Sequence, residues 1–133
     1  MTRLVLHIPG KVRLEHDPER KCFIMHWSSY HGPHYRQAIE TLLAEVKAHG
    51  AVTYISDASR PTDVQSQDDL AWIAVRMQEM PKLGVKRVVV VQPSSFVAKM
   101  GSRKLGQTAA SAGLERLEVS TLDEALALAR ARA

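Results

Sequence analysis

The sequence predicts an α/β fold: a mixed, mostly parallel sheet of about five strands, with an N-terminal antiparallel hairpin and about four covering helices. Alternating apolar residues near the N-terminus are typical of half-buried strands. Further along the chain, short apolar runs alternate with segments of helical period. This order is typical of strand–helix–strand units. The crossovers in such units are right-handed, so successive strands are parallel. No shift of composition marks a boundary, so we expect residues 1–133 to form a single α/β domain.

The predicted hairpin lies at the start of the chain. Apolar residues alternate on both sides of Pro9-Gly10, and again over residues 22–27. The segment 17–20 contains aspartate and proline, which favour a turn before this last strand. The alternation places Phe23, Met25 and Trp27 on one face and Cys22 and Ile24 on the other.

A change of period from 2 to 3.6 marks the first helix. Its apolar positions follow the i, i+3, i+4, i+7 spacing of a helix with one buried stripe. Gly50 follows it, where a left-handed cap is expected. Residues 51–56 are almost continuously apolar, which is typical of a strand covered on both faces. The helical stripe consists of Tyr35, Ala38, Ile39, Leu42, Leu43 and Val46.

A second helix and a buried strand follow. Ser66 and Asp69 have the spacing of a capping box, in which each side chain satisfies a free backbone N–H of the helix start. Pro81 is expected to end or kink this helix. The four valines at 88–91 are the clearest buried strand in the sequence.

The last third of the chain repeats this order. Residues 94–112 have helical character, interrupted by two glycines. Residues 114–119 form the last predicted strand, and Thr121 and Glu124 form a second capping box before a C-terminal helix.

The composition is that of a globular chain, with 45% hydrophobic and 24% charged residues. The single cysteine, Cys22, excludes an internal disulfide and is expected in the core. No signal peptide is recognised, and no run approaches the roughly 18 apolar residues of a membrane span. We therefore expect a cytoplasmic protein without membrane insertion.

The net charge of +4 is unevenly distributed. Residues 86–116 contain six lysines and arginines but a single glutamate. Such a patch suits an acidic protein or a phosphorylated ligand. Aromatic residues make up only 5% and none is interleaved with these charges, which argues against stacking on nucleic-acid bases.

Several short segments share a pattern with a known family: Trp27, Tyr35-Arg36-Gln37-Ala38, Tyr54-Ile55-Ser56-Asp57, Asp69-Leu70-Ala71-Trp72-Ile73, Lys86-Arg87-Val88-Val89-Val90 and Leu122-Asp123-Glu124-Ala125-Leu126. They resemble small bacterial proteins grouped with the STAS superfamily, the domains of sulfate transporters and anti-sigma-factor antagonists. Some members of this group are also likened to lipid-binding Sec14 domains. The resemblance implies a STAS-like fold and a role in signalling through protein contacts.

The chain departs from the family at its phosphorylation site. The best-known members are switched by phosphorylation of a serine in an Asp-Ser-Ser-Gly-like motif at the start of the helix after this strand. Here the sequence is Asp57-Ala58-Ser59-Arg60. The first serine is an alanine and the glycine is absent, so the departure argues against phosphorylation of Ser59 or Ser66.

Four aspartates lie in or beside the same loop. Carboxylate oxygens suit a magnesium ion, which is one interpretation of Asp57, Asp63, Asp68 and Asp69. Asp68 and Asp69 are better explained as first-turn charges that the helix dipole favours. We predict no metal at this loop.

Three histidines, His26, His31 and His34, lie within nine residues, but a tight zinc site needs a further fixed ligand. We interpret His31 and His34 as exposed loop residues. No nucleophile elbow and no glycine-rich phosphate loop occurs in the sequence. We therefore expect neither a cofactor nor enzymatic activity.

Function is expected at the loops that follow the strands, because open α/β proteins bind ligands beyond the carboxyl ends of their strands. These loops, residues 28–34, 57–66 and 92–95, are here called the rim. We predict a non-enzymatic regulatory or protein-interaction module that binds a protein partner, with a homodimer through an open sheet edge as one form. The candidate binding residues are Ser28, Ser29, His31, His34, Asp57, Ser59, Arg60, Ser94 and Ser95.

The alternative function is a domain that binds a small anionic or lipid-like molecule. The basic segment favours it, as do Ser94 and Ser95, whose predicted position at a helix start offers free N–H groups to a phosphate or carboxylate.

Overall fold

A computed structural model describes residues 2–92 and 113–132. The strands are β1 (Arg3–Ile8), β2 (Val12–Asp17), β3 (Cys22–Trp27), β4 (Thr53–Asp57), β5 (Arg87–Val91) and β6 (Glu115–Val119). The helices are α1 (His34–His49), α2 (Gln67–Arg76), α3 (Glu79–Lys82) and α5 (Leu122–Arg132). The prediction of an α/β fold with a mixed sheet is confirmed.

Within the described residues the sheet contains six strands, in the same order as they occur in the chain. β1, β2 and β3 pair antiparallel, and β3 to β6 pair parallel. About five strands were expected; the difference arises at the N-terminus, where the hairpin is part of a three-stranded unit. Gly10 has a φ of +74°, and the N–H of Lys11 donates to the carbonyl of Ile8, so the chain reverses between β1 and β2.

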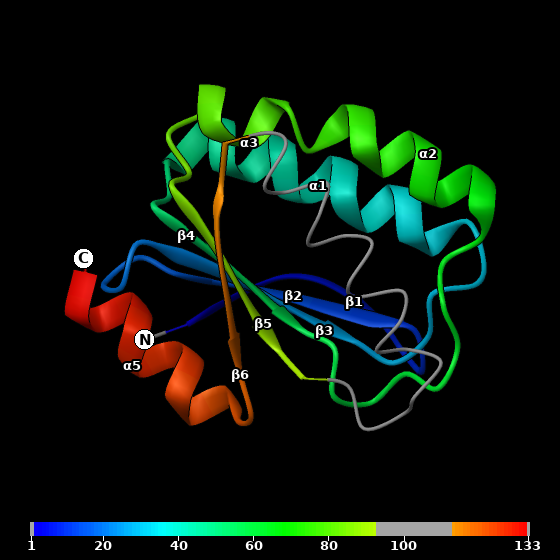
Figure 1. Cartoon of the computed structure of the whole chain (residues 1–133), viewed down its shortest axis with the longest axis horizontal. Helices are drawn as coiled ribbons and strands as arrows, with labels where there is room; N and C mark the ends of the chain where they lie inside the picture. The colour runs from blue at the N-terminus through cyan, green and yellow to red at the C-terminus, as the bar shows by residue number, and fades with distance from the viewer. Residues whose placement is uncertain (1, 93–112, 133) are drawn as a thin grey trace.

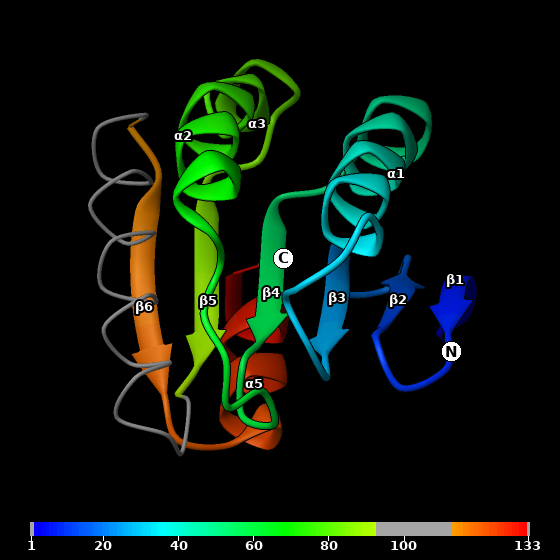
Figure 2. The ribbon, with the colours of Figure 1, turned by 90° about the vertical axis from the view of Figure 1, so that its right-hand side faces the viewer.

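Helices cover both faces of the sheet (Figure 1). α1, α2 and α3 lie on one face, called here the upper face, and α5 lies on the other, the lower face. The parallel strands follow one another across the sheet in chain order, and right-handed crossovers connect them. The helices of successive crossovers, α1 and α2, therefore lie on the same side of the sheet. Figure 2 shows that the four parallel strands end at the same edge of the sheet, so the loops that follow β3 and β4 are neighbours.

The two faces of β3 have the side chains that the sequence predicts. The upper-face core includes Phe23, Met25 and Trp27, whereas Cys22 and Ile24 belong to a separate, smaller core under α5. Both faces of this strand are therefore buried. Burial raises the pKa of the Cys22 thiol to about 12, so the thiol is not a reactive group at neutral pH.

Helix α1 buries every residue of its predicted stripe and, in addition, His34. Gly50 follows it with a φ of +79° and a ψ of 151°, so it is not the left-handed cap that was expected. This backbone conformation is accessible almost only to glycine, and the Gly50 N–H still donates to the carbonyl of Val46, 2.7 Å away.

Helix α2 begins at its predicted cap: the Asp69 N–H donates to the Ser66 hydroxyl, 3.1 Å away. In a full capping box the Asp69 carboxylate would in turn accept from the backbone N–H of Ser66. Here it accepts instead from Arg36 of α1 at 2.8 Å. α2 ends at Arg76, before Pro81, which lies inside the short helix α3. A proline ring conflicts with the carbonyl four residues earlier, which is that of Met77.

The C-terminal elements agree with the sequence where they are described. All five residues of β5 are buried, and β6 follows Gly113, whose φ is +85°. The Glu124 N–H donates to the Thr121 hydroxyl at the start of α5. The helix expected over 94–112, with Ser94 and Ser95, lies outside the described residues. Among the helices described, none combines the length and apolarity needed to cross a membrane.

Candidate functional site

The loops after β3 and β4 are joined by the carboxylate of Asp63. Its Oδ2 accepts from the Ser29 hydroxyl at 3.1 Å, and the backbone N–H groups of Tyr30 and His31 also donate to it, at 3.2 and 3.4 Å. A carboxylate that accepts from consecutive N–H groups satisfies donors that the turn leaves free. Residues 28–34 and 57–66 therefore form one continuous surface.

One histidine adds to this connection, and a second holds the conformation of the first loop. His31 donates from Nε2 to the carbonyl of Val64 at 2.6 Å, and His34 donates from Nε2 to the carbonyl of Ser29 at 2.6 Å. A carbonyl only accepts, so Nε2 carries the proton in both rings. His34 is 4% exposed, which corrects its interpretation as an exposed loop residue: as the first residue of α1 it faces Trp27 in the upper-face core.

A second network lies at the ends of β2, β3 and β4. His26 Nδ1 is 3.0 Å from Asp57 Oδ2, and His26 Nε2 is 2.7 Å from Glu15 Oε1. Asp57 Oδ1 also accepts from the hydroxyl of Ser59 at 2.6 Å and from its N–H at 3.2 Å. The imidazole of His26 thus lies between two carboxylates contributed by neighbouring strands.

The network sets the charge of its members. The hydrogen bond to Asp57 raises the pKa of His26, burial opposes this rise, and Glu15 adds to it. Burial acts to raise the pKa of Asp57, but the hydrogen bonds from His26 and Ser59 outweigh it, and that pKa is lowered. Both shifts favour the charged forms of the two groups, the imidazolium of His26 and the carboxylate of Asp57.

This arrangement differs from a hydrolase relay. A general-base histidine needs a nitrogen lone pair directed at a nucleophile, whereas both nitrogens of His26 face carboxylates. The Ser59 hydroxyl donates to Asp57 and not to His26. The geometry holds a fixed charge pattern and does not activate Ser59 as a nucleophile.

The remaining predicted site residues are distributed around the same edge. Ser28 is half-buried and Arg60 is exposed, and both line a groove on the lower face. The four aspartates do not converge: Asp57, Asp63 and Asp69 each bind different partners. Within residues 2–92 and 113–132, no group of three or more His, Cys, Asp or Glu side chains could hold a metal ion.

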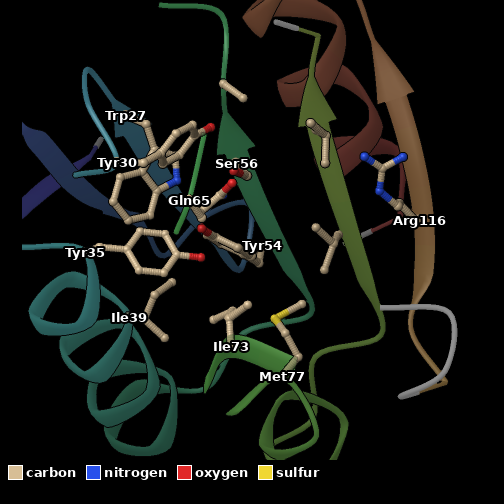
Figure 3. A pocket seen from close by; sticks show the side chains of 13 residues that line it. Trp27, Tyr30, Tyr35, Ile39, Tyr54, Ser56, Gln65, Ile73, Met77 and Arg116 are labelled. Carbon is tan, nitrogen blue, oxygen red and sulfur yellow. The ribbon is translucent and has the colours of Figure 1, made fainter. Parts of the chain in front are cut away.

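Sequence reasoning missed an aromatic cavity between α1, α2 and the upper face of the sheet (Figure 3). Its volume is about 50 Å³, and all three tyrosines of the chain line it, namely Tyr30, Tyr35 and Tyr54. Burial raises the pKa of Tyr54 to about 12, with opposing hydrogen bonds to Ser56 and Trp27. Most aromatic residues of the chain lie in or near β3 and β4, and this clustering could have predicted the cavity.

The cavity is small and mostly apolar. Ile73 of α2 and Met77, which follows α2, line the helix side of the cavity, and Gln65 places an amide beside the Tyr35 hydroxyl (Figure 3). Ligand pockets measure roughly 300–1,000 Å³. The cavity is well below that range and fits one or two water molecules or a very small ligand.

Comparisons of this chain with protein-family models, curated proteins and solved structures find no significant match.

Proposed function

We propose that the protein is a non-enzymatic regulatory or protein-interaction module of STAS-like fold, acting in the cytoplasm, that binds a protein partner through the rim. The observation that carries this proposal is the connection of two loops by Asp63. Loops held in one conformation before a partner arrives lose little conformational entropy on binding. The exposed side chains between them, such as His31 and Thr62, then form a preformed contact surface.

The chemistry of the polar network supports a binding role over a catalytic one. His26 is the best-placed titratable group near the rim, and its two nitrogens are engaged by Glu15 and Asp57. A group held as a charged ion pair orients a surface but does not accept a proton from a substrate.

A pair of matched variants tests the proposal. Thr62→Arg places a long cation on the exposed rim, and Gln78→Arg places the same side chain on an exposed position between α2 and α3. Wild type and both variants serve as bait in a lysate of the source organism. The captured proteins are quantified by mass spectrometry. Each candidate is then purified, and its affinity for the three proteins is measured by calorimetry.

We expect a partner whose affinity falls at least tenfold with Thr62→Arg and is unchanged with Gln78→Arg. Asp63→Ala, which releases the two loops, should weaken the same partner. If every captured protein binds all three variants as tightly as wild type, the rim is not a binding surface and the proposal is wrong.

A second copy of the chain is one candidate partner. Among the described strands β1 pairs only with β2, so its outer edge is open, and Leu4 on it is 56% exposed. Open edges pair readily with other strands. Sedimentation equilibrium of wild type and Leu4→Lys decides this: a dimer through β1 dissociates in the variant, and a monomeric wild type excludes it.

The aromatic cavity favours a second candidate function, binding of a small molecule. Tyr35, Tyr54 and Gln65 direct polar groups into an apolar space, the usual composition of a ligand site. A ligand that binds the folded state raises the melting temperature. A thermal-shift screen with anions small enough for this cavity, such as formate, should then give a hit that is lost in Ala58→Leu, which fills the cavity.

A further inference from the structure

A row of polar side chains crosses the lower face beside the rim. His7 of β1 is paired with Arg13 of β2, Arg13 with His26 of β3, and His26 with Asp57 of β4. Cross-strand partners point to the same face of a sheet, so these four side chains lie side by side. Helix α5 contacts β4, β5 and β6, at the other side of this face.

Three residues of this row, His7, Arg13 and His26, line a groove with a volume of about 320 Å³. One wall comes from the β1–β2 turn, and Arg60 of the β4–α2 loop and Ser28 line the groove as well. This volume is within the range of small-molecule sites, unlike that of the aromatic cavity. The groove is built mainly from strands, whose side chains are held in place by the sheet.

Arginines outnumber carboxylates among the residues that line this groove. Arg13 and Arg60 line it together with a single carboxylate, that of Glu15. Glu15 is engaged on two sides, by Arg13 at 3.2 Å and by His26 at 2.7 Å. Arg60 makes no ion pair with the described part of the chain, and the Arg13 side chain is 54% exposed. Guanidinium groups with free N–H donors bind phosphate oxygens in pairs.

We propose that this groove binds a phosphate monoester, with Arg13 and Arg60 contacting the phosphate and Ser28 donating its hydroxyl. The site does not depend on the protein partner proposed above. The phosphate comes from a free small molecule or from a phosphorylated side chain of another protein. The volume of the groove leaves room for an organic group beyond the phosphate itself.

The protonation of His26 affects this site. With His26 charged, the set Glu15, His26 and Asp57 carries one net negative charge, and with His26 neutral it carries two. The raised pKa of His26 extends the less negative state to higher pH. The affinity for a phosphate ester should therefore fall as pH rises through that pKa. The charged and titratable groups facing His26 are His7, Arg13, Glu15, Asp57 and Arg60.

Titration of ¹⁵N-labelled protein with inorganic phosphate and phenyl phosphate, at constant ionic strength, tests the proposal. We expect saturable shifts of the amide signals of residues 7–13, 28 and 60. Arg60→Gln should lower the affinity about tenfold, because it removes a charge-assisted contact. Lys82→Gln removes one exposed cation on α3 and should leave the affinity unchanged.

The two sources of phosphate are separated by a phosphoserine peptide. If phenyl phosphate binds at least as tightly as the peptide, the natural ligand is a small molecule. If the peptide binds more tightly and also shifts the amide signals of residues 30–34 and 61–66, the natural ligand is a phosphorylated side chain. The proposal is wrong if no probe gives saturable shifts in the groove, or if Arg60→Gln binds as tightly as wild type. Equal shifts around Arg3 and Lys21, a basic groove at the opposite edge, would likewise contradict it.

Discussion

The upper and lower faces of the sheet bury different kinds of residues. The upper face is covered by α1, α2 and α3 over a large aromatic and aliphatic core that includes Phe23, Trp27 and Tyr35. The lower face has a small core of Ile24, Ile55 and their neighbours under α5, with charged and polar side chains at its borders. The upper face thus provides stability, and the lower face keeps polar groups in fixed positions.

Adjacent residues of β3 offer the sharpest comparison. Phe23 and Cys22 are both 0% exposed and face opposite sides of the sheet. We expect Phe23→Ala to lower the free energy of unfolding by about 3–5 kcal/mol, because it leaves a large cavity. Cys22→Ala removes one sulfur atom and should cost about 1 kcal/mol. Urea denaturation measures both; equal costs would show that the two cores are equally important.

The network on the lower face is tested by Asp57→Asn. The variant keeps the size of the side chain, but its amide N–H₂ group meets the N–H of His26, so one charge-assisted hydrogen bond is lost. We expect a loss of about 2 kcal/mol in unfolding free energy. Ser59→Ala serves as the control and should cost less, since it removes a hydroxyl that donates to Asp57 but leaves the charge of Asp57 and its bond to His26 in place. An unchanged free energy of unfolding in Asp57→Asn would mean that the network does not contribute to stability.

A polar contact within the upper face gives a smaller effect. The Tyr35 hydroxyl forms a hydrogen bond with Gln65 at the cavity. Tyr35→Phe should lower the unfolding free energy by about 1 kcal/mol, as is usual for one buried hydrogen bond. Thermal denaturation of the two proteins, followed by circular dichroism, measures this difference. An effect as large as that of Asp57→Asn would remove the contrast between the faces.

The pH dependence of stability is expected to be the smallest effect, because histidines on the two faces act in opposite directions. Burial and the nearby Arg3 lower the pKa of His16 on the upper face, and its partners raise that of His26 on the lower face. The stability due to His26 is complete below the ordinary value of 6.5 and is lost as pH rises through the raised pKa. The stability due to His16 is present above 6.5 and is lost as pH falls through its lowered pKa.

Replacing each histidine separates the two contributions. In His26→Gln the unfolding free energy should rise with pH between 5 and 8, because His16 remains. In His16→Gln it should fall over the same range. Urea denaturation at several pH values measures both slopes, and slopes of the same sign would contradict the assigned environments.

Local patterns in the sequence predicted the elements well. The stripe of α1 and the Ser66 cap depend on residues a few positions apart, so spacing alone identifies them. The order of the elements also predicted that Ser29 and Asp57 lie at the same edge of the sheet. The extra strand was missed because the two alternating segments on either side of Pro9-Gly10 were counted together as one side of a hairpin, whereas each is a strand of its own.

The contacts within the site could not be predicted in this way. His26 and Asp57 are separated by 31 residues and meet only because β3 and β4 pair in one register. A shift of one residue would direct them to opposite faces. The connection by Asp63 depends on the conformations of two irregular loops, and the cavity depends on how two helices pack, neither of which is encoded in a short pattern.

The order of the strands bears on how the protein is made. Each strand pairs with the one synthesised just before it, from β1 to β6. A nascent chain leaving the ribosome can therefore add strands one after another, without waiting for a distant partner. The antiparallel pairs at the N-terminus close short loops and form readily, whereas each parallel pair needs a long crossover and forms more slowly. The growing molecule always has one newly formed edge, and the next strand to emerge covers it.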